Sequence, residues 1–76
     1  MAAKAFILIE TAVGKTKEVV TTLSPLKGVE SVDTVTGPYD IIAVVQRETL
    51  SDIGDLVTSK IHTVDGVTRT VTCMVI

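Results

Sequence analysis

Apolar and polar positions along the chain follow two periodicities, which predict strands and helices in turn. In the stretch KAFILIE, Phe6 and Leu8 fall on one face of an extended strand, and the other face carries Ala5, Ile7 and Ile9. Both faces are apolar, which is typical of a sheet covered on both sides. Residues 29–35 predict a second strand. Residues 39–46 predict a third, again apolar on both faces at residues 41–45.

The first helix is predicted between the first and the second of these strands. Its buried positions follow helical spacing at Thr16, Val19, Val20 and Leu23. Pro25 ends the helix by removing a backbone donor, and Gly28 suits a left-handed exit residue.

The second helix is predicted after the third strand. Thr49, followed three residues later by Asp52, resembles a capping box with the shorter acid. One buried stripe would contain Leu50, Ile53, Val57 and Ile61. Gly54 lies inside this helix, and two interpretations stay open: a neutral surface glycine, or a site where a neighbour packs closely.

The last strand is predicted in the stretch GVTRTVTCMVI. Strict alternation puts Val67, Val71, Cys73 and Val75 on one face, and Thr68, Thr70, Thr72 and Met74 on the other. Cys73 is expected to be a small buried hydrophobe. The order strand, helix, strand, strand, helix, strand predicts an α+β, ferredoxin-like βαββαβ sandwich: a four-stranded antiparallel sheet with two helices on one face.

This architecture leaves the second face of the sheet open, although the first and third strands are apolar there. An apolar sheet face needs a cover, and the most economical one is a second copy of the same sheet. The pattern therefore predicts a homodimer that forms through the sheet faces. Small domains without disulfides or metals commonly gain stability by such association.

Composition narrows the class of protein. The 76 residues predict one domain, 1–76, with an aliphatic core, because the aromatic residues are only Phe6 and Tyr39. The formal net charge is −2 and the seven Lys and Arg are scattered, so no basic face for direct nucleic-acid binding is expected. Neither a signal sequence nor a membrane span is recognised, and a cytoplasmic location is expected.

Candidate catalytic and metal chemistry is sparse. A metal carrier on this scaffold would show a CxxC pair near the first loop, which here reads TAVGKT. His62 falls at a predicted helix C-terminus, where a partly charged imidazole suits the helix dipole; the alternative of a catalytic base has no partner placed by the sequence. We expect no metal, cofactor or catalytic residue, and hence no enzyme.

The stretch TGPYDI joins the second and third strands and allows two interpretations. Gly37 and Pro38 make a turn that Asp40 caps. Alternatively, Asp40 stands at the rim of an apolar sheet, where a carboxylate needs partners. Backbone amides or the ammonium group of a ligand would both serve.

The whole pattern resembles a known module. Gly37, Tyr39 and Asp40 form a Gly-x-Tyr-Asp stretch before the third strand, and Gly66-Val67 opens a threonine-rich last strand. This arrangement is similar to the effector-binding (RAM) domain of the Lrp/AsnC feast-famine transcriptional regulators. The resemblance covers essentially the full chain. In that family a helix-turn-helix usually precedes the domain, whereas this sequence begins at the domain's first strand. We therefore expect the stand-alone form of the domain.

The resemblance implies a set of binding residues and partners. In that family, two domains pair through their sheets to form a dimer, and the dimers assemble into rings, commonly octamers. Small effectors, typically amino acids, bind at the contacts between dimers. Carried over, the ligand-binding residues would be Gly37, Tyr39, Asp40, Thr70 and Thr72, with Asp40 facing an α-ammonium group. Thr70 and Thr72 match the family's threonine positions, and they also fit a plain strand. Pro38 departs from the acidic or polar residue that many relatives have there.

The resulting hypothesis is a self-assembling, amino-acid-sensing regulatory domain without its own DNA-binding part. It would modulate transcription through its oligomeric state or by co-assembly with a full-length Lrp/AsnC regulator. The alternative from another class is a small dimeric ferredoxin-like enzyme of the monooxygenase or isomerase type. A third alternative is an assembly module with a degenerate site.

Overall fold

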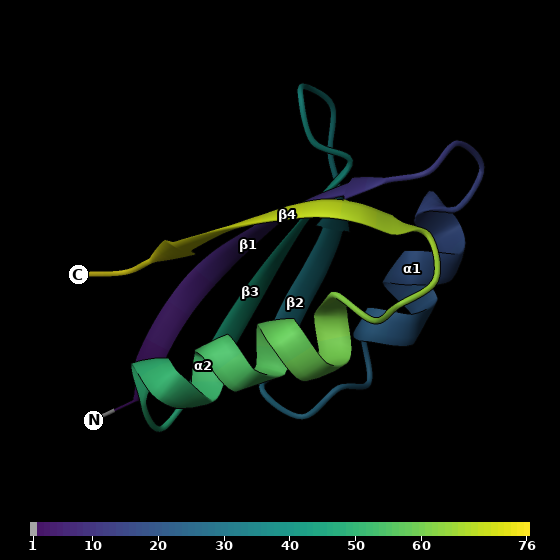
Figure 1. The fold of residues 1–76 in the computed structure, drawn as a ribbon. Coiled ribbons are helices and arrows are strands. Elements are labelled where there is room, and N and C mark those ends of the chain that lie inside the picture. Colours follow the sequence, from purple (N-terminus) through teal and green to yellow (C-terminus); the bar gives the residue numbers. More distant parts are fainter. Residues whose placement is uncertain (1) are drawn as a thin grey trace.

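The computed structural model describes residues 2–76 and contains four strands, two α-helices and one π-helical turn (Figure 1). In chain order these elements are β1 (Ala3–Thr11), α1 (Thr16–Leu23), β2 (Val29–Thr34), β3 (Ile41–Arg47), α2 (Leu50–Leu56), the π turn η1 (Val57–Ile61) and β4 (Val67–Met74). The order is the predicted βαββαβ.

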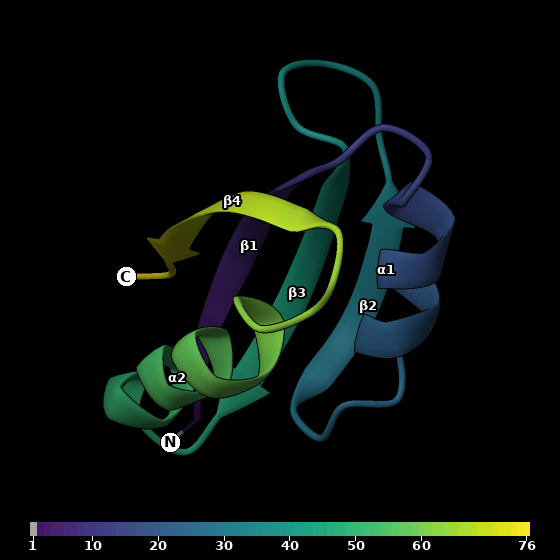
Figure 2. The same ribbon diagram turned by 45° about the vertical axis from the view of Figure 1, so that its right-hand side comes forward.

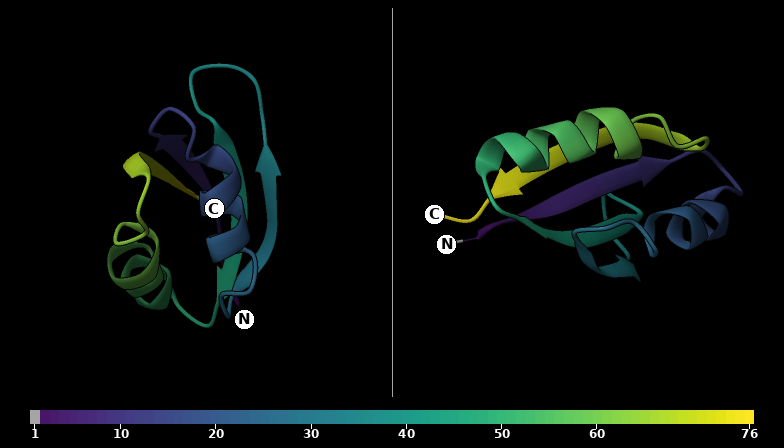
Figure 3. Two further views of the ribbon diagram at one scale, coloured as in Figure 1. Left: turned by 90° about the vertical axis from the view of Figure 1, so that its right-hand side faces the viewer. Right: turned by 90° about the horizontal axis from the view of Figure 1, so that it is seen from below.

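The strands form one antiparallel sheet in the order β2-β3-β1-β4. Both helices lie on the same face, α1 next to β2 and α2 next to β1 and β3 (Figures 2 and 3). The predicted ferredoxin-like α+β class is therefore confirmed. Within residues 2–76, no helix has the length and apolar content needed to cross a membrane.

The core lies between the sheet and the helices and is wholly aliphatic. Alternate residues of the two central strands are fully buried: Ala5, Ile7, Ile9, Ile41, Ala43 and Val45. The register pairs Ile7 with Ala43 and Ile9 with Ile41, so these side chains share one face. The helices cover them with Val19, Leu23, Ile53, Leu56, Val57 and Ile61.

The first helix agrees with its predicted pattern. Val19 and Leu23 are buried, and the helix ends before Pro25. Gly28 has a φ of +97°, the left-handed conformation predicted for a helix exit.

The second helix begins as predicted, and three of the four residues of the predicted stripe are buried: Ile53, Val57 and Ile61. The hydroxyl of Thr49 accepts a hydrogen bond from the backbone N–H of Asp52 at 3.0 Å. Leu50 is 54% exposed because it lies in the first turn, and Leu56 is the buried residue instead. A Cβ on Gly54 would meet nothing within 4 Å, so the interpretation of Gly54 as a neutral surface glycine is confirmed.

The strict alternation predicted for the last strand is wrong at its first residue. The register shifts between Glu10 and Thr11: Glu10 pairs with Arg69 but Thr11 pairs with Val67, so Thr68 is an extra residue in β4. Val67 therefore packs against the core, whereas Val71 lies opposite Leu8 on the open face. A single inserted residue moves a strand's side chains to the other face.

The prediction that Cys73 is buried is also wrong. Cys73 is exposed because it lies opposite Phe6 on the open face, which no other element of residues 2–76 covers. That face is apolar across three strands, with Phe6 39% exposed and further side chains half-buried at Leu8, Ile42, Val44 and Val71.

Candidate functional site

The segment that follows β2, residues 35–40, is a loop that projects beyond the end of the sheet (Figures 1 and 2). The backbone N–H of Val35 donates to the carbonyl of Asp40 at 2.9 Å and closes the loop at its base. Gly37 has a φ of +119°, which favours glycine, and a Cβ there would meet nothing within 4 Å. The loop is thus closed at its base and open to solvent at Gly37.

Asp40 attaches this loop to the end of β1. Its backbone N–H donates to the carbonyl of Ile9 at 2.9 Å, and its Oδ2 accepts from the backbone N–H of Thr11 at 2.8 Å. Tyr39 and Asp40 are half-buried, and β3 begins only at Ile41, so the predicted start of that strand at residue 39 is two residues too early. The backbone-amide interpretation of Asp40 accounts for one of its two carboxylate oxygens.

Thr11, the residue bound by Asp40, also contacts the first helix. Its hydroxyl lies 2.7 Å from the hydroxyl of Thr16, the first residue of α1. The next backbone N–H, that of Ala12, donates to the carbonyl of Gly66 at 2.8 Å. The end of β1 therefore joins the loop 35–40, the start of α1 and the turn before β4. Sequence reasoning missed Thr11 and Thr16, because neither residue belongs to a recognisable motif.

Lys15, near this end of the molecule, forms two ion pairs. Among residues 2–76, the ion pairs join Lys15 to Glu18 at 3.3 Å and to Asp65 at 3.6 Å. The hydrogen bond and charge of Glu18, and then the charge of Asp65, raise the pKa of Lys15 above its usual value. Neither ion pair involves Asp40.

The structure does not bring Thr70 and Thr72 to Asp40 within one chain. Thr70 lies opposite Ile9 and Thr72 opposite Ile7, on the face that the helices cover. Ile9 pairs with Ile41 on its other side, so β1 separates Thr70 from the start of β3. Two strand spacings amount to about 10 Å. The predicted binding residues thus form two separate groups, one at the loop 35–40 and one on β4.

The group on β4 has a partner that the sequence did not reveal. The Nε2 of His62 lies 2.5 Å from the hydroxyl of Thr70. His62 directly follows the π turn η1, so its predicted place at a helix C-terminus is confirmed. The wider π turn itself could not be predicted from the helical pattern of the sequence. His62 and Thr70 line an open hollow of about 270 Å³ together with Val67, Thr68 and Arg69.

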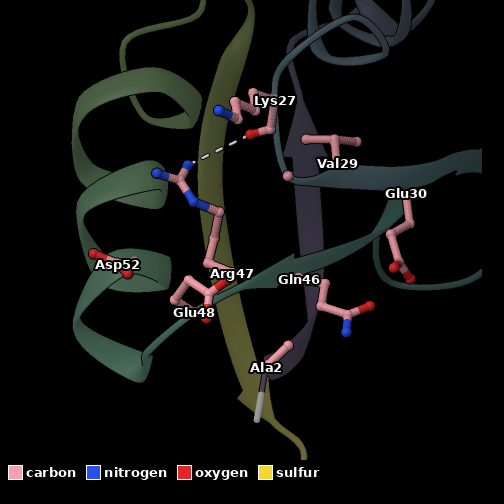
Figure 4. Close-up of a pocket in the computed structure, with 9 residues that line it drawn as sticks. Ala2, Lys27, Val29, Glu30, Gln46, Arg47, Glu48 and Asp52 are labelled. Atoms are coloured by element: carbon pink, nitrogen blue, oxygen red, sulfur yellow. Dashed lines mark hydrogen bonds between the residues drawn. The ribbon is translucent and has the colours of Figure 1, made fainter.

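A larger hollow, of about 530 Å³, lies at the opposite end of the sheet (Figure 4). Arg47 crosses it and donates to the carbonyl of Lys27 at 3.4 Å. A Cβ on Gly28 would lie 2.5 Å from Cδ of Arg47 and 3.2 Å from the carbonyl oxygen of Gln46, and its φ of +97° also favours glycine. The lining is of mixed charge and contains none of the predicted binding residues: Ala2, Lys27, Gly28, Val29, Glu30, Gln46, Arg47, Glu48 and Asp52.

Comparisons with known proteins agree on one family. The profile of the Lrp/AsnC ligand binding domain matches residues 4–76. No curated protein sequence matches the chain.

Solved structures share the fold over nearly the whole chain. FFRP-DM1 is 36% identical, with a TM-score of 0.93, and the match covers 97% of this chain and 99% of that one. The hypothetical protein PHS023 from Pyrococcus horikoshii is 37% identical, with a TM-score of 0.91 and coverage of 100% and 90%. The transcriptional regulator NMB0573 from Neisseria meningitidis, solved as a complex with L-Met, is 17% identical, with a TM-score of 0.87 and coverage of 97% and 49%; this likeness concerns the fold alone.

Proposed function

The chain belongs to the Lrp/AsnC ligand-binding domain family, and on that premise we propose that it senses an amino acid and transmits the signal through its state of assembly. The family is one of regulatory ligand-binding domains, which favours regulation over the enzyme alternative. The proposal names the class of ligand, the residues that bind it and the role of oligomerisation.

The observation that carries the proposal is the setting of Asp40. One carboxylate oxygen accepts the Thr11 N–H, which fixes the orientation of the group at the end of an apolar sheet. Within residues 2–76 the second oxygen has no hydrogen-bond donor, so it can accept from a ligand. The α-ammonium group of an amino acid is a suitable donor, because charge-assisted hydrogen bonds are about twice as strong as neutral ones. The regulator NMB0573, about half of which has this fold, was solved as a complex with L-Met, which supports an amino acid as the ligand class.

The separation of the two predicted groups supports a site shared between copies. Asp40 and Thr70 lie on opposite sides of β1, with about two strand spacings between them. One small ligand would contact both groups if a second copy supplied one of them. Gly37 and Tyr39 would add the loop 35–40 to the first group, and Thr72 would extend the second.

The apolar open face supports the assembly itself. Phe6, Leu8 and Val71 lie on a face that no other element of residues 2–76 covers, and pairing two such faces would bury them. We propose a homodimer of this kind, with a higher ring such as an octamer built from dimers. A ligand would shift this assembly, or co-assembly with a full-length Lrp/AsnC regulator, by binding one state more tightly than the other.

The test is a thermal-shift screen of the twenty amino acids with three variants. A ligand at a hundredfold over its Kd stabilises by about 2.7 kcal/mol per site, a rise of several degrees in Tm. Asp40→Asn keeps an acceptor for the Thr11 N–H but removes the charge, so it should abolish the shift while the fold persists. Asp40→Ala removes both the acceptor and the charge. Asp33→Asn, on β2, is the matched control and should show the same thermal shift as the parent protein.

Two results would contradict the proposal. One is the absence of a shift across the whole panel. The other is a shift that Asp40→Asn leaves intact, which would place the ammonium group elsewhere. Size-exclusion chromatography with light scattering, with and without the active amino acid, then shows whether binding changes the oligomer.

A further inference from the structure

The orientation of the Asp40 carboxylate depends on a backbone N–H at an irregular place in the sheet. The donor is Thr11, the last residue of β1, where the register with β4 shifts. At such a bulge the ladder is locally disrupted, so regular strand pairing does not by itself fix the direction of the N–H. Other contacts must hold Thr11 in place.

Two contacts hold this residue, one on each side. The hydrogen bond from Ala12 to the carbonyl of Gly66 fixes the backbone that follows it. The contact between the hydroxyls of Thr11 and Thr16, at 2.7 Å and partly buried, fixes its side chain against the start of α1. The chain of contacts runs from Thr16 through Thr11 to Oδ2 of Asp40.

We propose that Thr16 is a positioning residue for Asp40. Its hydroxyl holds Thr11, and Thr11 in turn aims its N–H at Oδ2 and leaves Oδ1 directed to a ligand. This inference rests on the proposed function for its purpose, ligand binding, but the mechanical link from Thr16 to Asp40 can be measured without a ligand. Preorganising a binding group in this way strengthens binding by lowering the cost of ordering it.

Other threonines of the same helix provide matched controls. Thr22 donates its hydroxyl to the carbonyl of Glu18 at 2.9 Å, within α1 itself. Thr22→Val therefore removes the same chemical group from the same helix without touching the link to Asp40. Thr16→Ser retains a hydroxyl at the linking position and should restore what Thr16→Val loses.

The first experiment is amide hydrogen exchange measured by NMR on the ligand-free protein. Thr16→Val should accelerate exchange of the Thr11 amide by about threefold to tenfold, the usual range for one hydrogen bond. Thr16→Ser and Thr22→Val should leave that amide as in the parent protein. In an Asp40→Ala background Thr11 has already lost its acceptor, so adding Thr16→Val should change its exchange rate little.

Two outcomes would overturn the inference. The Thr11 amide could exchange equally fast with and without the Thr16 hydroxyl. Alternatively, Thr16→Val could accelerate exchange just as much in the Asp40→Ala background, which would show a general loosening of α1 and no route through Asp40.

The second experiment measures binding of L-methionine by calorimetry. Thr16→Val should weaken the affinity by about threefold to tenfold, and Thr16→Ser should restore it. The two claims fail in different ways. If no amino acid binds the parent protein but Thr16→Val still frees the Thr11 amide, the proposed function falls and the positioning link stands. If binding is intact in Thr16→Val and the Thr11 amide is unchanged, the positioning link falls and the proposed function stands.

Discussion

The two faces of β1 differ in what completes them. Ile7 and Ile9 are fully buried under the two helices, whereas Phe6, their neighbour on the other face, is 39% exposed. At the centre of the strand both faces are apolar by sequence, so hydrophobicity there does not distinguish them. What distinguishes them is that, in the described part of the chain, both helices pack on the same face. An apolar pattern thus shows that a face must be covered, while the topology decides whether the same chain covers it.

The largest expected effect concerns the covered face. Ile7→Ala should destabilise the fold by about 2–5 kcal/mol, because it leaves a cavity among fully buried neighbours. Denaturant unfolding measures the change. Phe6→Ala, on the open face of the same strand, should cost less in dilute monomer; an equal loss from both variants would show that the two faces are equally buried in solution.

The second effect is on association. Leu8→Glu puts a charge at the middle of the open face, opposite Val71, and should convert the proposed dimer to monomer without unfolding it. Light scattering reports the mass, and circular dichroism checks that the secondary structure is retained. Lys17→Glu, at an exposed position of α1 on the other side of the sheet, is the control. A Leu8→Glu protein that keeps the parent mass would remove the open face as the dimer interface.

The third effect tests the close packing on the covered side. Gly66 has a φ of +101°, and a Cβ there would lie 2.7 Å from Cβ of Lys15 and 3.1 Å from Cγ2 of Val19. Gly66→Ala should destabilise by about 1–3 kcal/mol through backbone strain and overpacking. Thermal unfolding measures it, and an unchanged Tm would show that the turn before β4 relaxes freely.

The smallest effect has the opposite sign. Gly54 lies on the outer side of α2 with open space where its Cβ would be. Gly54→Ala should stabilise by about 0.5–1 kcal/mol through helix propensity. A loss of stability, measured in the same denaturant series as Ile7→Ala, would reveal a contact at this surface in the assembled protein.

The strands and helices could be predicted because their periodicities are long and regular. The buried residues of β1 and β3 follow a strict period of two, and Thr49 with Asp52 marks the start of α2. The exact face of β4 could not be predicted, since a bulge adds one residue without any mark in the sequence. The exposure of Cys73 follows from which face of the sheet the helices cover, and the local alternation of residues does not show this.

The candidate site was harder to predict than the fold. Asp40 was singled out because an acid beside an apolar strand needs partners, and the structure provides one of them in Thr11. The partners themselves come from other elements: Thr11 is 29 residues away from Asp40, and His62, which follows the π turn, contacts Thr70 on β4. Contacts of that kind depend on how elements dock, which the spacing of residues along the chain does not specify.

The bulge at Thr68 also bears on aggregation. β4 is an outer strand of the sheet, and a flat outer strand offers its free backbone groups to any other extended chain. The extra residue twists the start of β4 out of a straight ladder, and the Thr68 hydroxyl turns back to the carbonyl of Glu10 at 3.0 Å. This interruption is confined to the start of the strand, because the register from Arg69 to Met74 is regular, so a foreign strand would find only a shortened row of backbone groups along this edge.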